Sequence, residues 1–298
     1  MRTGILLLDK PLGISSNAAL QRVRRLLGAA KAGHVGSLDP LATGMLPICL
    51  EEATKIAGEI LAGRKCYRFS IGLGERTATG DAEGAVIQSL PVPALAPADI
   101  GRVLALFRGR QRQIPPMYSA LKRAGEPLYR LARAGQVVER AARAIDISEI
   151  KLQSFDSARL ELEVICSKGT YVRTLAEDIA QALGTCGYVT RLHRVYVEPF
   201  MSEAMHTLES IESARAGGEF PALLPADYPV GHLAALHLDA ARALRLRQGQ
   251  TVGADAAASG SVRLYDESGR FFGLGVADGQ GQVRPRRLFV LWPDHHHR

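Results

Sequence analysis

Two segments of the chain alternate between polar and apolar residues, and this period of two limits the possible folds more than any other feature. KCYRFSIGLG (65–74) places Tyr67, Phe69 and Ile71 on one face, and RLELEVICS (159–167) repeats the pattern. Such alternation is typical of strands with one buried face. Helical patterns elsewhere do not alternate regularly with the strands. The sequence therefore predicts an α+β fold around a mixed sheet rather than a doubly wound fold.

Two helices and a further strand are indicated around these segments. Residues 5–8 form a short apolar run typical of a buried strand. A helix is expected from a cap at Ser15 or Ser16 to Leu27, because apolar residues fall on one of its faces and arginines on the other. GTYVRTLAEDIAQALG (169–184) predicts another helix, which Gly184 ends.

The composition changes near residue 225. FPALLPADYPVGH (220–232) is a proline-bearing linker, and short glycine-rich strand patterns follow it. The clearest of these are SVRLYD, FFGLGVAD and RRLFVLW, which begin at residues 261, 271 and 286. This pattern favours a larger domain at 1–225 and a small β-rich domain at 226–298. The basic run RPRR (284–287) is either a solvated rim or a phosphate-binding edge.

Composition and charge favour an anionic partner without requiring one. The 298 residues carry a net charge of +7, and 30 of the 37 basic residues are arginines. Arginine is suited to phosphate contacts, although GC-rich codons explain the same excess. The four cysteines lie too far apart for a metal pair and are expected to be reduced, buried thiols of a cytoplasmic protein. No signal peptide or membrane-spanning segment is indicated, and the closing HHHR is too short to indicate a metal site.

The stretch GHVGSLDPLATGMLPICL (33–50) holds one carboxylate, Asp39, among apolar and small residues. The following Pro40 favours an extended backbone at Asp39 and keeps it out of a helix. Partial burial raises the pKa of a carboxyl group unless a cation lies nearby. The candidate cation is Arg173, at the start of the predicted helix. An ion pair would keep Asp39 charged and oriented, as a carboxylate nucleophile requires.

A simpler interpretation of the same residues is available. Asp39 could merely cap a turn, and Arg173 could pair with Glu177 one helical turn later. Spacing alone favours this alternative, because it cannot show that two residues 134 positions apart meet.

Four motifs resemble those of a known family. DKPLGISSN (9–17), GHVGSLDPLATGMLPICLEEATK (33–55), QIPPMYSALK (113–122) and CSKGTYVRTLAEDIA (166–180) are similar, in this order, to the motifs of the bacterial tRNA pseudouridine-55 synthases of the TruB type. The resemblance covers roughly residues 4–200. It implies a pseudouridine-synthase-like, largely antiparallel mixed sheet flanked by helices and loops. The tail resembles, more weakly, a small PUA-type RNA-binding domain.

The resemblance implies an isomerase that acts on tRNA. Enzymes of this family convert uridine-55 of the T-arm to pseudouridine by breaking the N1–C1′ bond and rejoining the base through C5. The target base must leave its stack first. No cofactor or metal is implied, in keeping with a sequence that has no P-loop or dinucleotide fingerprint. A cytoplasmic monomer that needs no protein partner is expected.

The resemblance also assigns roles to individual residues. Asp39 matches the catalytic aspartate and Arg173 the arginine that pairs with it. Tyr67 matches the tyrosine that stacks on the base and is placed to take the C5 proton, although a plain core tyrosine fits its strand equally simply. Tyr171 matches an adjacent active-site tyrosine. Whether Asp39 attacks C1′ directly or acts through a glycal intermediate stays open.

Three further residues are assigned to substrate binding. Leu192 matches an apolar residue of the uracil pocket, and an ordinary core leucine is nearly as good an interpretation. His34 matches a histidine that occupies or stabilises the space of the extruded nucleotide. Lys10 either holds the Asp39 loop or contacts phosphate.

Two rival functions are compatible with the same motifs. The first is a guide-RNA-dependent pseudouridine synthase, which shares the catalytic motifs but often carries charge-rich extensions that this chain lacks. The second is an RNA-binding protein or tRNA chaperone without activity. The joint presence of Asp39, Tyr67 and Arg173 disfavours the second, because binding alone needs no acid beside RNA phosphate.

Overall fold

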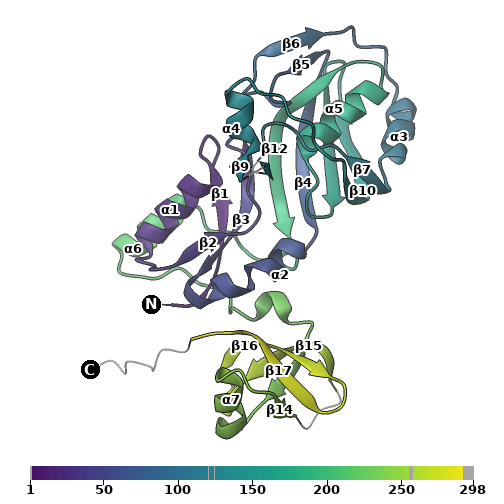
Figure 1. The fold of residues 1–298 in the computed structure, drawn as a ribbon. Coiled ribbons are helices and arrows are strands. Elements are labelled where there is room, and N and C mark those ends of the chain that lie inside the picture. Colours follow the sequence, from purple (N-terminus) through teal and green to yellow (C-terminus); the bar gives the residue numbers. More distant parts are fainter. Residues whose placement is uncertain (1, 120, 124, 255–257, 291–298) are drawn as a thin grey trace.

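The structure is a computed structural model, and it describes residues 2–119, 121–123, 125–254 and 258–290. A large sheet and a small sheet lie in two separate lobes of the molecule (Figure 1). The large sheet has the order β1 (Gly4–Lys10), β3 (Ala42–Leu50), β12 (Gly187–Val197), β4 (Lys65–Leu73), β11 (Arg159–Cys166), β10 (Arg143–Phe155), β7 (Gly109–Gln113), with β2 (Ala32–His34) also paired to β3. Only β3 and β12 pair in parallel, so the predicted mixed, largely antiparallel sheet is confirmed.

The remaining elements of the larger domain are short strand pairs and helices. The strand pairs are β5 (Glu75–Thr77) with β6 (Val86–Ser89), and β8 (Lys122–Arg123) with β9 (Glu126–Pro127). The helices are α1 (Ser16–Leu26), η1 (Glu51–Ile56), α2 (Ala57–Ala62), α3 (Pro97–Leu106), α4 (Leu128–Arg133), α5 (Val172–Ala182) and α6 (Leu208–Ala216).

The alternating segments form neighbouring strands in the middle of the sheet. In β11 every second residue from Leu160 is buried, and Phe69 and Ile71 of β4 join the same apolar cluster. Helix α5 packs on this cluster through Leu175, Ala176 and Ile179. The buried face that the period of two predicts is therefore the face that α5 covers.

Helix α1 begins and ends close to the predicted residues. Ser15 is its N-cap, and the Ser15 hydroxyl accepts a hydrogen bond from the backbone N–H of Ala18 at 3.1 Å. Ser16 is buried and has another role, described below. Helices α1 and α6 lie side by side over β1 and β3 (Figure 1), and their apolar residues share one cluster with those strands.

The C-terminal domain contains a five-stranded sheet with one helix. Its strands, in sheet order, are β13 (Ala234–His237), β15 (Ser259–Tyr265), β16 (Phe271–Asp278), β17 (Gln282–Leu288) and β14 (Val252–Gly253); its helix is α7 (Ala240–Arg247), and η2 (Tyr228–Val230) precedes it. The domain packs against the larger one, because Leu274 and Phe289 share an apolar cluster with Ile5 and Phe200. The boundary at 225/226 stays a prediction.

The last predicted strand was misplaced. β17 covers residues 282–288 rather than 286–292, and residues 291–292 lie outside the described part of the chain. Pro285 lies beside a register shift that leaves Arg286 as an extra residue opposite β16. A proline is tolerated at such a bulge. The basic run Arg284–Arg287, here called the basic edge, therefore lies inside a strand.

Three further expectations concern the cysteines, the C-terminus and membrane-spanning segments. All four cysteines are buried and free, as predicted. The HHHR terminus lies outside the described residues. Within residues 2–290, apart from the gaps noted above, no helix is long and apolar enough to cross a membrane.

Candidate active site

The loop between β2 and β3, residues 35–41 and here called the Asp39 loop, is held by its backbone at three points. Arg194 donates from Nη2 to the carbonyl of Gly36 at 2.9 Å. The Ser16 hydroxyl accepts from the N–H of Leu38 at 2.7 Å and donates to the carbonyl of Leu38 at 2.9 Å. Lys10 donates from Nζ to the carbonyl of Pro40 at 3.4 Å. Buried polar groups on three other elements thus fix the backbone around Asp39.

Arg173 meets Asp39 across the site. Its Nε lies 2.9 Å from Oδ2 of Asp39, and its Nη1 lies 3.5 Å from Oδ2 of Asp81. The remaining guanidinium donors bind the carbonyls of Thr79 at 2.9 Å and Tyr118 at 2.7 Å. The Arg173 side chain is only 6% exposed, whereas that of Asp39 is 40% exposed. The arginine is therefore a fixed support, and the aspartate presents its carboxylate to the solvent side.

The predicted ion pair thus exists in the structure, and the alternative pairing with Glu177 is not among the ion pairs of the described residues. Arg173 is the second residue of α5, and the helix begins immediately after β11 and the turn that follows it. The sheet brings this turn beside the Asp39 loop. Sequence spacing could not show that closeness.

The charges around Asp39 act in opposite directions. Burial raises the pKa of Asp39, Arg173 lowers it, and the nearby Asp81 carboxylate raises it again. Asp81 itself is 2% exposed and accepts from the Thr79 hydroxyl at 2.5 Å and the N–H of Glu83 at 3.1 Å. Two carboxylates therefore share one guanidinium, and the cluster is anionic when both are charged.

An open cavity of about 700 Å³ lies over the pair. It is lined by Asp39 and Arg173 together with His34, Asp81, Tyr118 and Tyr129, among others. Its walls come from the Asp39 loop, the start of α1, the turn after β5, and the side chains of Tyr118, Ser119 and Tyr129. A cavity of this size and mixed polarity accommodates a nucleoside.

His34 lines this cavity at the end of β2. Its Nδ1 is buried and has no hydrogen-bond partner in the described structure. Burial lowers the pKa of His34, and the charge of Arg194 lowers it further. The ring is thus held neutral.

Lys10 is fully buried and does not line the cavity. Its Nζ donates to the carbonyls of Pro11 at 2.8 Å, Ile14 at 2.7 Å and Pro40. Burial lowers its pKa from 10.5 to about 8, against the pull of Asp39. This geometry favours the first of the two predicted roles, support of the Asp39 loop, over contact with phosphate.

Tyr67 and Leu192 lie at the inner side of the site. Tyr67 is half-buried on β4 and packs against the apolar cluster beneath α5. Leu192 is 8% exposed on β12 and lies opposite both Ala42 and Phe69 in the sheet. Burial raises the pKa of Tyr67, while Arg194 lowers it. Both residues are close to the Asp39 loop, and neither is among those that line the open cavity.

Tyr171 is the N-cap residue of α5. Its backbone is fixed by Gln113, which accepts from the Tyr171 N–H at 2.8 Å and donates to the Tyr171 carbonyl at 3.1 Å. Burial raises the pKa of the Tyr171 hydroxyl. The pair of hydrogen bonds positions the segment immediately before Arg173.

Sequence reasoning missed the supports of the site: Asp81, Ser16, Gln113 and Arg194. Asp81 lies in ERTATGDAEG, which looks like an ordinary polar turn. Ser16 competes with Ser15 as a helix cap, and only one of them can have that role. The sole signal for Arg194 was a charged residue at an inward position of a strand pattern.

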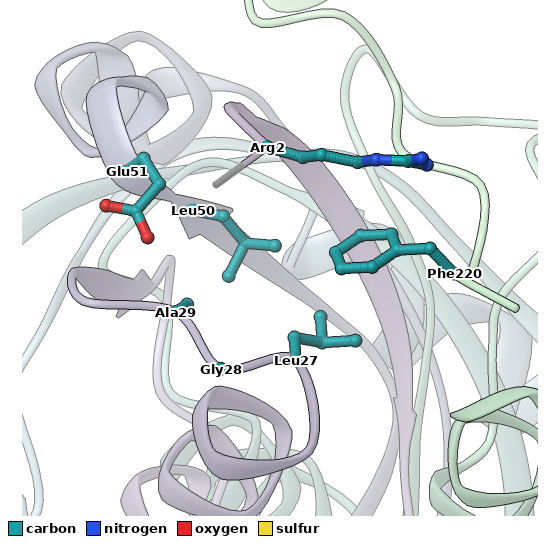
Figure 2. Close-up of a pocket in the computed structure, with 7 residues that line it drawn as sticks. All are labelled: Arg2, Leu27, Gly28, Ala29, Leu50, Glu51 and Phe220. Atoms are coloured by element: carbon teal, nitrogen blue, oxygen red, sulfur yellow. The ribbon is translucent and has the colours of Figure 1, made fainter. Parts of the chain in front are cut away.

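A second, smaller hollow lies away from Asp39, beside the start of β1. Figure 2 shows its lining, with Arg2 over the ring of Phe220 and Glu51 on the opposite side. Arg2 is the only cation among the seven lining residues and Glu51 the only acid. The cavity over Asp39 gathers far more titratable groups and is the candidate active site.

Within the described residues, no group of three or more His, Cys, Asp or Glu side chains could hold a metal ion. Asp39 and Asp81 instead share Arg173.

Three family domains match successive parts of the chain. Residues 24–172 match the TruB family pseudouridylate synthase N-terminal domain. Residues 173–230 match the tRNA pseudouridylate synthase B C-terminal domain, and residues 234–289 match the C-terminal domain of pseudouridine synthase II TruB.

Relatives of similar length share about half of the sequence. The chain is 50% identical to tRNA pseudouridine synthase B of Chromohalobacter salexigens over 288 residues, which are 96% of this chain and 94% of the relative. It is also 50% identical to the protein of the same name from Aromatoleum aromaticum over 285 residues, 96% of this chain and 92% of that one.

Solved structures share the fold at low identity. An archaeal box H/ACA sRNP Nop10–Cbf5 complex superposes with a TM-score of 0.72 at 22% identity, covering 97% of this chain and 89% of that chain. An H/ACA RNP bound to a substrate RNA gives a TM-score of 0.71 at 20% identity, covering 97% and 85%. The likeness therefore extends over both domains of the fold.

Proposed function

Because the chain belongs to the TruB family of pseudouridylate synthases, we propose that it converts uridine-55 in the T-arm of tRNA to pseudouridine. The enzyme class, a tRNA pseudouridine synthase, follows from the family and from relatives that are half identical over nearly the whole chain. We propose in addition the position in the tRNA, the flipping of the base and the roles of single residues.

One observation carries the proposal. Asp39 lines a nucleoside-sized cavity with a side chain that is 40% exposed, and a buried arginine holds its carboxylate at 2.9 Å. The isomerisation needs a charged acid beside C1′ of the sugar. Whether the acid attacks C1′ or acts through a glycal intermediate, the Arg173 guanidinium orients it and opposes the rise in its pKa that burial causes.

The other residues divide the remaining work. Tyr67 stacks on the base and takes the C5 proton, and Leu192 and Tyr171 enclose the uracil. His34, neutral and without a partner at Nδ1, fills or stabilises the space of the extruded nucleotide. Lys10 supports the loop through the Pro40 carbonyl. No cofactor is needed for this chemistry.

The decisive experiment uses the purified chain alone. An in vitro transcribed T-arm stem-loop, incubated with the protein and no guide RNA, should acquire one pseudouridine at the position of uridine-55. A matched stem-loop with cytidine at that position is the control. Conversion that requires an added guide RNA would favour the guide-dependent rival, and binding without conversion would favour the chaperone.

The proposal includes a monomer that acts on tRNA in the cytoplasm without a protein partner.

A further inference from the structure

Arg194 is a buried cation without an acid. Arg194 is 1% exposed and has the largest fully buried side chain of the described structure. Within residues 2–290, apart from the gaps noted above, Arg194 forms no ion pair with a carboxylate within 4.0 Å. Removing a charge from water is unfavourable unless its partners compensate, and an apolar residue of similar volume often serves stability better. Burial alone does not explain the charge, so its contacts decide whether it has a further use.

The contacts of Arg194 join three parts of the site. Its Nε donates to the carbonyl of Met45 on β3 at 2.6 Å, and its Nη2 donates to Gly36 in the Asp39 loop at 2.9 Å. In the sheet, Arg194 lies directly opposite Tyr67 of β4 and Gly44 of β3. A Cβ atom at Gly44 would lie 2.2 Å from the Arg194 carbonyl oxygen, so only glycine permits this close approach. The side chain thus reaches from the neighbouring strands to the loop.

Tyr67 is the third neighbour of Arg194, because the two residues lie directly opposite each other on β4 and β12. The charge of Arg194 lowers the pKa of the Tyr67 hydroxyl against the rise that burial causes. Cys166 on β11 and Asp39 both raise that pKa. Among these three groups, Arg194 is the cation.

We propose that Arg194 is the positioning residue that makes the Tyr67 oxygen a proton acceptor. This inference rests on the proposed function. In the final step the C5–H bond breaks, and its electron pair forms the C5–C6 double bond of uracil. The π pair of the C6–N1 bond moves to N1, which takes a proton from water. The C5 proton goes to the Tyr67 oxygen, while the phenol's own proton passes to water. The guanidinium offers hydrogen bonds to that oxygen as negative charge develops on it, and its bond to Gly36 holds the tyrosine in register with the Asp39 loop.

Two variants test this role. Arg194→Met removes the cation and keeps much of the volume, and Arg194→Lys keeps a cation with a single donor centre. The substrate is the T-arm stem-loop with hydrogen or deuterium at C5 of the target uridine. We expect Arg194→Met to lower kcat by about 10²-fold, the scale of a lost acid–base contribution, with KM little changed. We expect a larger C5 deuterium isotope effect than in the wild type, and intermediate values for Arg194→Lys.

A second measurement needs no RNA. With ¹³C at the ζ carbon of tyrosine, NMR follows the ionisation of Tyr67, identified by the signal that Tyr67→Phe removes. At a pH of about 10.5, a little above the ordinary tyrosine pKa of about 10, a smaller fraction of Tyr67 should be ionised in Arg194→Met than in the wild type. Lys65→Met, which removes another buried cation, should leave both the isotope effect and this titration unchanged.

The outcomes separate the inference from the proposed function. A fall in rate without a larger isotope effect, together with an unchanged Tyr67 titration, would reduce Arg194 to a structural residue and overturn the inference. So would wild-type kinetics in Arg194→Met. If the wild type fails to convert the stem-loop, the proposed function fails, while the titration still decides whether Arg194 acts on Tyr67. If Arg194→Met does not fold, Arg194→Lys gives the same comparisons.

Discussion

The Asp39 loop and the basic edge differ in the burial of their charged side chains. Around the loop, Lys10, Arg173 and Arg194 are buried, and their donors are directed to named carbonyls or carboxylates. At the basic edge the arginines are exposed, and Arg286 binds Glu59 of the larger domain at 2.9 Å. A catalytic group must be in place before the substrate arrives, because reorganisation during the reaction raises the barrier. Contacts to phosphate can form as the RNA binds.

This difference shows which part of the molecule is less stable than it could be because its residues serve function. Buried cations without acids are unfavourable for folding, yet Lys10 and Arg194 both lie behind the Asp39 loop. Each of them hydrogen-bonds a backbone carbonyl within four residues of Asp39. We therefore expect substitutions behind the loop to change turnover and those at the basic edge to change binding.

The largest effect should come from the acid itself. Asp39→Asn keeps the shape of the side chain and removes its charge, so neither attack on C1′ nor a glycal route has its acid. We expect pseudouridine formation to fall by at least about 10⁴-fold, as in other enzymes that lose a covalent catalyst, while affinity for the stem-loop survives. Single-turnover assays and filter binding measure the two quantities. Turnover within tenfold of the wild type would remove Asp39 from its role.

The second effect concerns the proton at C5. Tyr67→Phe keeps the stacking ring but deletes the hydroxyl, so the rearranged base should form and fail to lose its C5 proton. Release of tritium from [5-³H]uridine in the stem-loop should slow by about 10²- to 10⁴-fold. Mass spectrometry of the digested RNA would detect the trapped product. Full activity of the variant would assign proton removal to another group.

A matched pair of buried lysines separates loop support from general stability. Lys10 and Lys65 are both buried, both donate only to carbonyls in the described hydrogen bonds, and both have a pKa lowered to about 8 by burial. Only Lys10 contacts the Asp39 loop. Lys10→Met should lower kcat by about 10- to 100-fold, since small misplacements of catalytic groups have such effects. Lys65→Met is the control, and an equal loss in both would refute loop support.

The same lysine predicts how stability depends on pH. The pKa of Lys10 is about 8 in the folded protein and 10.5 ordinarily, so between these values the unfolded chain binds a proton that the folded protein has released. The free energy of unfolding of the wild type, relative to Lys10→Met, should therefore rise from pH 8 to 10.5, by up to about 3 kcal/mol. Urea titrations at several pH values measure this difference. A difference that falls with pH would show that the folded protein holds the proton.

Sequence reasoning succeeded where a residue's own neighbours determine its environment. The period of two in β4 and β11 and the capping serine of α1 are local, and they were predicted closely. Asp39 stood out because an acid is unusual in apolar surroundings. The partners of the loop could not be derived in this way: Arg194 is 158 positions from Gly36, and only the parallel pairing of β3 with β12 brings them together. Asp81 was hidden for the same reason.

The smallest effect should come from the basic edge. Removal of the whole tail is a poor test, because Leu274 and Phe289 pack against the larger domain and their loss would uncover apolar surface. Arg284→Ala with Arg287→Ala in the full chain removes two exposed charges and leaves the Arg286–Glu59 pair intact. If both arginines contact phosphate, the slope of log affinity against log salt on full-length tRNA should decrease by roughly 0.7–0.9 for each.

Turnover of the minimal stem-loop should stay within about threefold of the wild type in this double variant, because exposed charges that steer binding contribute little to the chemical step. Arg22→Ala, which breaks an exposed ion pair with Glu212 on α6, provides the matched loss of an arginine elsewhere on the surface. An unchanged slope in the double variant would mean that the basic edge faces solvent. A loss of turnover on the stem-loop would mean that the edge acts on the Asp39 loop across the domain contact. It would contradict the expectation that the basic edge changes only the binding of RNA.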